Sequence, residues 1–153
     1  MAKVFDFLHA TNDVLTDRGI QLPLEGQSTT TPETREDRGL AVQKEIVGAD
    51  VIDGMYAGAS EDEVHFLHLL SANCFGDHYT RTGIDVATRE LLTFAMLVSL
   101  GGCAPQAKGH VAANLNVGNT RAVLLDVITQ LRPFIGYRRT LNALAAINEV
   151  TES

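Results

Sequence analysis

The sequence predicts an all-α fold. Three observations carry this prediction: apolar residues recur at the helical 3.6-residue period over most of the chain after residue 37, the β-branched alternation typical of strands is scarce, and Gly and Pro fall between the periodic segments. The chain has 153 residues, of which 45% are hydrophobic and 20% are charged. A single domain with a sizeable core is therefore expected.

Residues 1–37 are expected to form an N-terminal arm and linker. Val4, Phe5 and Leu8 fit one or two short helices over residues 3–19, whereas residues 21–37 are rich in Thr, Pro, Glu, Gln and Gly and predict a loop. A connection of that length is unusual inside a compact domain. We therefore expect the arm to lie on the body of the chain or on a neighbouring subunit, and the helical domain to span residues 38–153.

The first half of the helical domain predicts short helices. Residues 38–47 have helical periodicity, and residues 48–58 form a short helical or turn region. Ser60 and Glu63 have the spacing of a capping box, which predicts a helix rich in Leu immediately after them. Gly76 and Asp77 then predict a break.

The second half predicts longer helices with clear boundaries. Asp85 is the expected cap of an apolar core helix that Gly101 and Gly102 end. Pro105 suits the first turn of the next helix, which is expected to run to about residue 117. Two further helices are predicted after Gly118, divided by Pro133 and Gly136, the last over about residues 137–150. Six or more helices are thus expected.

Charge and hydropathy exclude two classes of partner. Twelve Lys and Arg against nineteen Asp and Glu give a net charge of −7, and no basic patch stands out, so nucleic-acid binding is not expected. The longest uncharged stretch, residues 91–107, is interrupted by glycines and a proline, so no membrane span is expected. The first residues lack the apolar run of a signal peptide. We expect a cytoplasmic protein.

Cys103 and His110 are the first candidates for chemistry. Cys103 lies at or just before a predicted helix N-terminus, where partial positive charge favours a thiolate; the alternative is a small side chain packed at a helix junction. His110 is seven residues further, on nearly the same face but about 10 Å away along the axis. It is either a general acid or base or a histidine satisfied within the core. Direct activation of the thiol by His110 would need a bent chain or a bridging water.

Other polar residues leave alternatives open. Glu90 is either a desolvated proton-transfer group or a first-turn residue that stabilises the helix dipole. Cys74 precedes His78 by four residues, which would make a second thiol–imidazole pair if the helix continued. The spacing of Glu61, His65 and His68 fits three metal ligands but fits a solvent-facing stripe better. We expect no metal and no cofactor. The arginines that could bind an anionic substrate are Arg81, Arg132, Arg138 and Arg139.

Several blocks of the chain together resemble the carboxymuconolactone decarboxylase family, whose superfamily also holds the alkylhydroperoxidase D-like proteins. The resemblance covers about residues 38–150. Its blocks are residues 75–81, 89–93, 100–106, 109–111, 114–119, 134–137 and 141–144. The resemblance implies a helical fold assembled as trimers or hexamers, with a site near the helix that carries Cys103 and His110 and close to a subunit interface.

The resemblance also implies roles for particular residues. In the alkylhydroperoxidase branch a Cys-x-x-Cys, a following histidine and a preceding glutamate form a thiol and proton-relay system. Cys103, His110 and approximately Glu90 match three of these positions, but Gln106 replaces the second cysteine. A dithiol cycle would then need Cys74 as the resolving thiol. The residues expected to bind substrate are Arg89, His78, Tyr79 and Arg81.

Two enzymatic hypotheses and one non-enzymatic hypothesis follow. The first is a carboxy-lyase that decarboxylates a small carboxylated lactone or related acid, with His110 and Glu90 moving protons and an arginine holding a carboxylate. The second is a peroxiredoxin-like thiol peroxidase that reduces hydroperoxides at Cys103. The third is an oligomeric protein that binds a small molecule without converting it.

Overall fold

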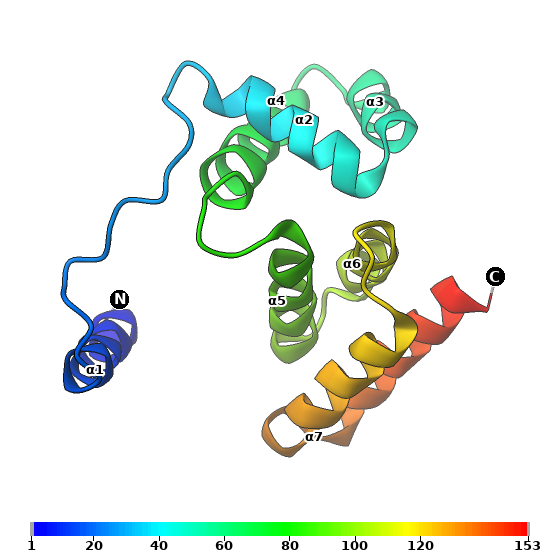
Figure 1. The fold of residues 1–153 in the computed structure, drawn as a ribbon. Helices are drawn as coiled ribbons and strands as arrows, with labels where there is room; N and C mark the ends of the chain where they lie inside the picture. Colours follow the sequence, from blue (N-terminus) through cyan, green and yellow to red (C-terminus); the bar gives the residue numbers. More distant parts are fainter. Residues whose placement is uncertain (1, 153) are drawn as a thin grey trace.

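The computed structural model describes residues 2–152 and contains only helices within them, as predicted (Figure 1). Its longest helix turns back on itself, and one of its helices is of the π type. In chain order the elements are α1 (Ala2–Asp17), α2 (Arg35–Val47), α3 (Ala49–Gly58), α4 (Val64–Leu69), the π-helix η1 (Leu70–Tyr79), α5 (Val86–Leu100), α6 (Ala104–Asn116) and α7 (Arg121–Thr151).

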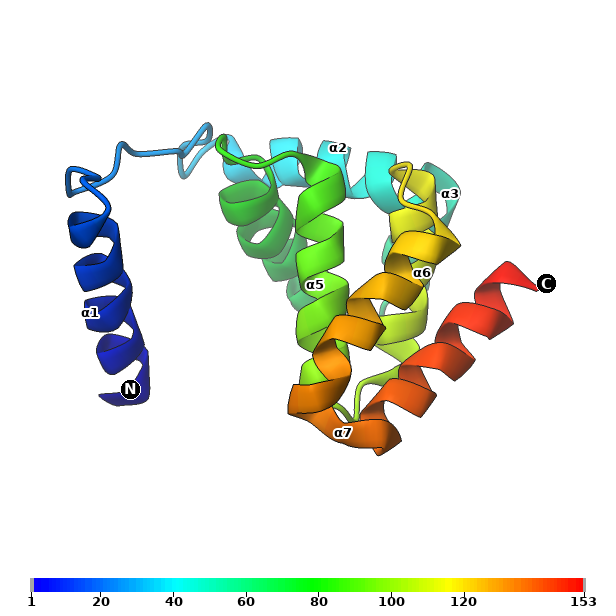
Figure 2. The same cartoon turned by 60° about the horizontal axis from the view of Figure 1, so that its bottom comes forward.

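The body of the molecule has two adjoining hydrophobic clusters. The larger lies among α5, α6 and α7, where Phe94, Val111 and Leu124 are buried together. The smaller lies among α2, η1 and α6, around Ile46 and Phe75. Helix α6 contributes to both clusters and so joins the two halves (Figures 1 and 2). Within residues 2–152, no helix is long and apolar enough to cross a membrane.

Helix α2 and the π-helix η1 cross in very close contact. A Cβ on Gly39 would lie 1.9 Å from the carbonyl oxygen of Ser71, and one on Gly76 would lie 2.0 Å from that of Arg35. The break predicted at Gly76 and Asp77 is therefore wrong, because this glycine serves the contact between two helices and η1 continues through it to Tyr79. In a π-helix the hydrogen bonds join residues five apart, so Cys74 and His78 are not aligned as in an α-helix.

Most helix boundaries in the second half are as predicted. The Asp85 side chain accepts a hydrogen bond from the Thr88 N–H at 2.7 Å and caps α5, and Gly101, with φ of 71°, follows the last residue of that helix. Pro105 lies in the first turn of α6. Helix α7 bends sharply at Gly136, with φ of 74°, so that its second half turns back toward the first, and residues of both halves enter the larger cluster (Figure 2).

The capping box predicted at Ser60 and Glu63 does not form. The Ser60 hydroxyl donates to the carboxylates of Asp62 and Glu63 instead of capping a backbone N–H, and α4 begins only at Val64. An N-cap hydroxyl ordinarily accepts a hydrogen bond from a backbone N–H, but here the carboxylates of the acidic turn bind the Ser60 hydroxyl as a donor. Helix α2 also begins at Arg35, three residues before the predicted start.

Helix α1 stands apart from the body at the end of an extended linker (Figures 1 and 2). The linker itself is attached: the Thr29 hydroxyl donates to Thr80 O at 2.8 Å, the Thr30 hydroxyl to Gly76 O at 3.0 Å, and the Thr82 N–H to Gln27 O at 3.0 Å. The predicted arm is therefore a single helix that does not lie on its own body.

Candidate functional site

Glu90 and His110 form a hydrogen-bonded pair between α5 and α6. The His110 Nδ1–H donates to Glu90 Oε2 at 2.7 Å. Glu90 is fully buried, whereas the His110 side chain is 24% exposed. Within residues 2–152, the other carboxylate oxygen, Glu90 Oε1, has no hydrogen-bond partner. The pair thus combines a desolvated carboxylate with an imidazole that solvent or a small molecule can reach.

The helical register of α5 turns Glu90 inward. Asp85 fixes where the helix starts, and Glu90 precedes Phe94 by four residues, so both side chains lie on the buried face. Of the two sequence interpretations of Glu90, the desolvated one describes its surroundings: it is not a solvated first-turn residue. A buried carboxylate without a partner would be strongly unfavourable, and His110 supplies the partner.

Two asparagines hold the two helices together around the pair. The Asn114 amide, fully buried, donates to Glu90 O at 3.1 Å and to His110 O at 2.7 Å. The Asn119 amide donates to Asn114 Oδ1 at 2.8 Å and to Ala87 O at 2.9 Å. Sequence reasoning assigned these residues no role in the site, although the spacing of four between His110 and Asn114 could have indicated that they share a helix face.

The charge of Glu90 affects the pKa of two side chains of η1, Tyr79 and Cys74. Burial raises the pKa of Tyr79 strongly, and the Glu90 carboxylate raises it further. Burial is also the main cause that raises the pKa of Cys74, again with a contribution from Glu90. The Tyr79 hydroxyl donates to Thr93 Oγ1 at 2.6 Å, since the Thr93 hydroxyl itself donates to Arg89 O. Both groups are therefore protonated at neutral pH, and Tyr79 is packed in the core instead of open to substrate.

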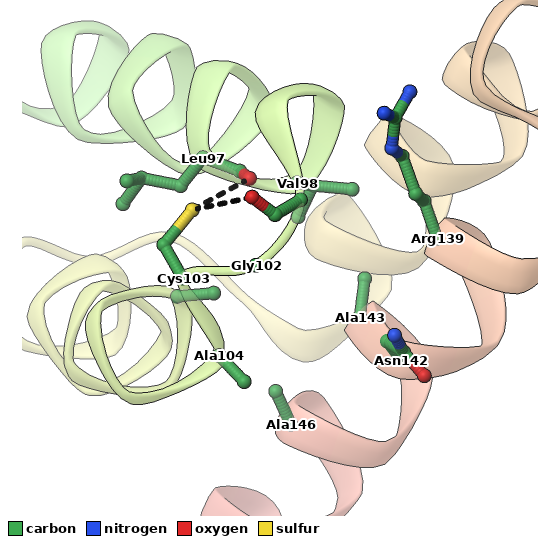
Figure 3. Close-up of a pocket in the computed structure, with 11 residues that line it drawn as sticks. Leu97, Val98, Gly102, Cys103, Ala104, Arg139, Asn142, Ala143 and Ala146 are labelled. Carbon is green, nitrogen blue, oxygen red and sulfur yellow. Dashed lines mark hydrogen bonds between the residues drawn. The ribbon is translucent and has the colours of Figure 1, made fainter.

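Cys103 lies at the other end of the same two helices. It occupies the N-cap position of α6, but its thiol donates to two carbonyl oxygens, Leu97 O at 3.3 Å and Gly101 O at 3.5 Å (Figure 3). The geometry does not place His110 in hydrogen-bond contact with this sulfur.

An apolar pocket opens beside Cys103, enclosing about 350 Å³ of empty space with its mouth included. Residues of α5, α6 and the second half of α7 line it, among them Leu97, Ala107, Arg139 and Ala146 (Figure 3). Cys74 packs instead against the cluster of Ile46, Phe75 and Tyr79. Both cysteines are free thiols, and they lie in different surroundings.

The predicted cationic residues are divided among different tasks. The Arg89 guanidinium donates to Arg81 O at 2.9 Å and Thr82 O at 3.0 Å, so it fixes the connection between η1 and α5. His78, near the end of η1, is exposed, and Arg81, two residues after the end of η1, is half-buried. Arg132 lies over the Tyr137 ring, 5.5 Å from its centroid.

The stripe of Glu61, His65 and His68 does not form a metal site. His68 pairs with Glu36 of α2, and the His65 ring lies against the Phe66 ring at an interplanar angle of 37°. Among the residues that the structure describes, no three His, Cys, Asp or Glu side chains are grouped so as to hold a metal ion.

Comparison with known proteins identifies the family. The sequence profile of the carboxymuconolactone decarboxylase family matches residues 65–149, more than half of the chain. The chain belongs to this family. A 4-carboxymuconolactone decarboxylase of Acinetobacter baylyi is 26% identical over 118 residues, which cover 77% of this chain and 87% of that protein. The matched segment of the family includes Glu90 and His110 as well as Cys74 and Cys103.

Proposed function

We propose that this member of the carboxymuconolactone decarboxylase family is a carboxy-lyase that decarboxylates a small carboxylated lactone. The observation that carries the proposal is the buried Glu90–His110 pair, in which a fully desolvated carboxylate holds a partly exposed imidazole at 2.7 Å. The similarity to a decarboxylase of 4-carboxymuconolactone supports the same class of substrate.

In the proposed reaction His110 is the proton donor. The bond between the lactone carbon and its carboxylate breaks, carbon dioxide leaves, and the electron pair stays on the lactone as a dienolate. A proton moves from the His110 ring to the carbon, and solvent then reprotonates the ring. Glu90 accepts from Nδ1, so it fixes the tautomer and the orientation of the ring. His78, near the end of η1, and Arg81, two residues after it, remain the proposed carboxylate anchors.

The test is turnover of 4-carboxymuconolactone by the purified full chain. We expect loss of carbon dioxide with wild-type protein, a decrease in kcat of about 10²–10⁴-fold in His110→Ala, and a change below about threefold in Cys103→Ser. The proposal fails if no lactone acid is decarboxylated, or if His110→Ala retains the wild-type rate. Binding of the lactone without turnover would favour the non-catalytic hypothesis.

Reduction of hydroperoxides at Cys103 is the second candidate, because this thiol lines an apolar pocket. The thiolate would attack the peroxide oxygen, releasing an alcohol and leaving a sulfenic acid that an external thiol must reduce. The presence of Gln106 where the alkylhydroperoxidase branch has its second cysteine argues against it. Intact mass after stoichiometric peroxide tests it: an added oxygen that disappears in Cys103→Ser would support the peroxidase.

A further inference from the structure

The Glu90 carboxylate is buried with only one of its two oxygens hydrogen-bonded. Oε2 accepts from His110 Nδ1 at 2.7 Å, whereas Oε1 has no hydrogen-bond partner among residues 2–152, in a side chain with no exposed surface. A carboxylate oxygen in this position has lost water without gaining a donor, which is strongly unfavourable. A neighbouring group with a rotatable hydrogen would therefore gain free energy by pointing that hydrogen at Oε1.

Two hydroxyl groups lie on the elements beside this carboxylate, one on α5 and one on η1. Thr93 follows Glu90 by three residues, a spacing that brings two side chains of one helix to about 5–6 Å from each other at Cβ. The Tyr79 hydroxyl lies 2.6 Å from Thr93 Oγ1. The Tyr79 ring is buried and packs on Phe75, with 4.9 Å between the ring centroids. Packing thus holds the phenol oxygen in place, while its hydrogen remains free to rotate.

The hydrogen bond between Tyr79 and Thr93 can run in two directions, since either hydroxyl can donate. In the first arrangement Tyr79 donates to Thr93, and Thr93 donates to Arg89 O at 3.0 Å. In the second arrangement Thr93 donates to Tyr79, and the Tyr79 hydrogen becomes available to Glu90 Oε1. Arg89 O keeps a donor in both, because an α-helix also brings it the backbone N–H four residues further on. Two hydrogens rotate, and no proton leaves its oxygen.

The charge of Glu90 favours the second arrangement. A hydroxyl makes a stronger hydrogen bond to a carboxylate than to another hydroxyl. Burial is the main cause that raises the pKa of Tyr79, and the Glu90 side chain raises it further, both through its charge and as a hydrogen-bond acceptor. Glu90 acts on the Cys74 thiol through its charge alone, and a thiol is a weak donor. Tyr79 is therefore the donor that suits Oε1.

We propose that Tyr79 is a positioning residue for the Glu90–His110 pair, its hydroxyl donating to Glu90 Oε1 while the carboxylate is charged. The carboxylate is then held at both oxygens, by Tyr79 at Oε1 and by His110 at Oε2, so it does not rotate, and the imidazole keeps one orientation. Tyr79 acts from the core and does not touch substrate. The consequence for catalysis rests on the function proposed above, whereas the hydrogen bond itself does not.

Proton NMR of the full, ¹⁵N-labelled chain tests the hydrogen bond without any substrate. A tyrosine hydroxyl that donates to a buried carboxylate resonates well downfield of the amides, and the absence of coupling to ¹⁵N distinguishes it from the His110 ring proton. We expect this resonance in wild type, its loss in Tyr79→Phe, and a large upfield change in Glu90→Gln, where the acceptor is neutral. Thr93→Val should keep it downfield, because Glu90 is then the remaining acceptor.

Steady-state kinetics on the lactone acid tests the positioning role. Tyr79→Phe should lower kcat about tenfold and change KM less than about twofold, because the pair loses its orientation while substrate contacts stay intact. Thr93→Val should lower kcat less than about threefold, since Tyr79 can still donate to Glu90. The matched control, Tyr56→Phe, removes a half-buried hydroxyl that lies 2.8 Å from Ser71 Oγ in a separate network, and should leave kcat unchanged.

Each test has an outcome that overturns the proposal. A Tyr79 resonance that stays in place in Glu90→Gln, or no downfield hydroxyl resonance in wild type, would mean that Tyr79 donates to Thr93 alone. Equal losses of kcat in Tyr79→Phe and Thr93→Val would mean that their contact only supports the fold. If no lactone acid is decarboxylated, the proposed function fails, and the NMR result still decides the hydrogen bond. Circular dichroism checks folding, and the Glu90→Gln and Thr93→Val spectra decide the matter if Tyr79→Phe does not fold.

Discussion

Helices α5 and α6 share a buried contact, and the candidate side chains lie at two points of it that differ in the groups around them. At the first, the fully buried Glu90 carboxylate binds the His110 ring, and Asn114 binds the backbone of both. At the second, the Cys103 thiol faces two carbonyl oxygens and apolar pocket residues. The comparison shows that a carboxylate and an imidazole are directly hydrogen-bonded at the first point, whereas the thiol at the second point contacts backbone carbonyl oxygens.

The largest expected effect separates the two points directly. Glu90→Gln keeps the size of the side chain but removes the charge that orients His110, so kcat for decarboxylation should fall about 100-fold or more. Cys103→Ser should change it less than about threefold. Steady-state kinetics on the lactone acid measures both, with Glu61→Gln, an exposed carboxylate of the turn before α4, as the control. Equal losses in the Glu90 and Cys103 variants would remove the distinction between the two points.

The next effect concerns the crossing of α2 and η1, a contact that supports the surroundings of Glu90 and not those of Cys103. Gly76→Ala forces a Cβ against Arg35 O in the crossing of α2 and η1, and should decrease the free energy of unfolding by about 1–3 kcal/mol. Gly109→Ala, in α6 with open space around it, should instead increase it by up to about 1 kcal/mol. Urea denaturation measures both changes. A neutral Gly76→Ala would mean that η1 and α2 can move apart, and that Tyr79 and Cys74 are not fixed beside Glu90.

Local signals predicted much of the fold. Asp85 and Gly101 bound α5, and Gly136 divides α7, because capping and positive φ depend on the residue itself and its near neighbours. Local signals of this kind do not predict the π-helix. In the sequence Gly76 resembles a helix breaker. Its role is visible only in the fold, where it packs against Arg35 of α2, about forty residues earlier in the chain.

The candidate site was predictable in its members but not in their arrangement. Sequence reasoning named Glu90 and His110, but which alternative held for Glu90 depended on the packing of α5 against α6. Arg89 was expected to bind substrate and donates to the backbone of the preceding loop, because that loop passes beside it. The role of Asn114 also depends on two helices meeting, so no spacing within one helix could establish it.

A smaller effect tests whether the charge of Glu90 acts on Cys74 and not on Cys103. The pKa of Cys74 is raised by burial and additionally by the Glu90 charge. Glu90→Gln should therefore lower this pKa, increase the thiolate fraction at pH 8, and speed alkylation of Cys74 by iodoacetamide a few-fold, less than the roughly tenfold of a full pKa unit. Alkylation of Cys103 in the same sample should keep its rate. Peptide mass spectrometry follows both thiols, and parallel acceleration of the two would show a general loosening of the fold.

The smallest effect comes from the cap at the start of α5, the helix end nearer to Glu90. Hydrogen bonds from the Thr88 N–H and the neighbouring backbone lower the pKa of Asp85 below its ordinary value of 3.8. A lowered pKa in the folded state means that the charged cap stabilises the protein fully above the unfolded pKa, and that this stabilisation disappears as the pH falls through the folded one. Wild type should thus be slightly more stable than Asp85→Asn at pH 7, and the difference should vanish well below pH 4. Thermal unfolding across this range measures it. A difference that stays constant would mean that the carboxylate caps α5 by geometry alone, and hydrogen exchange should then show no acid-induced fraying of the turn that leads to Glu90.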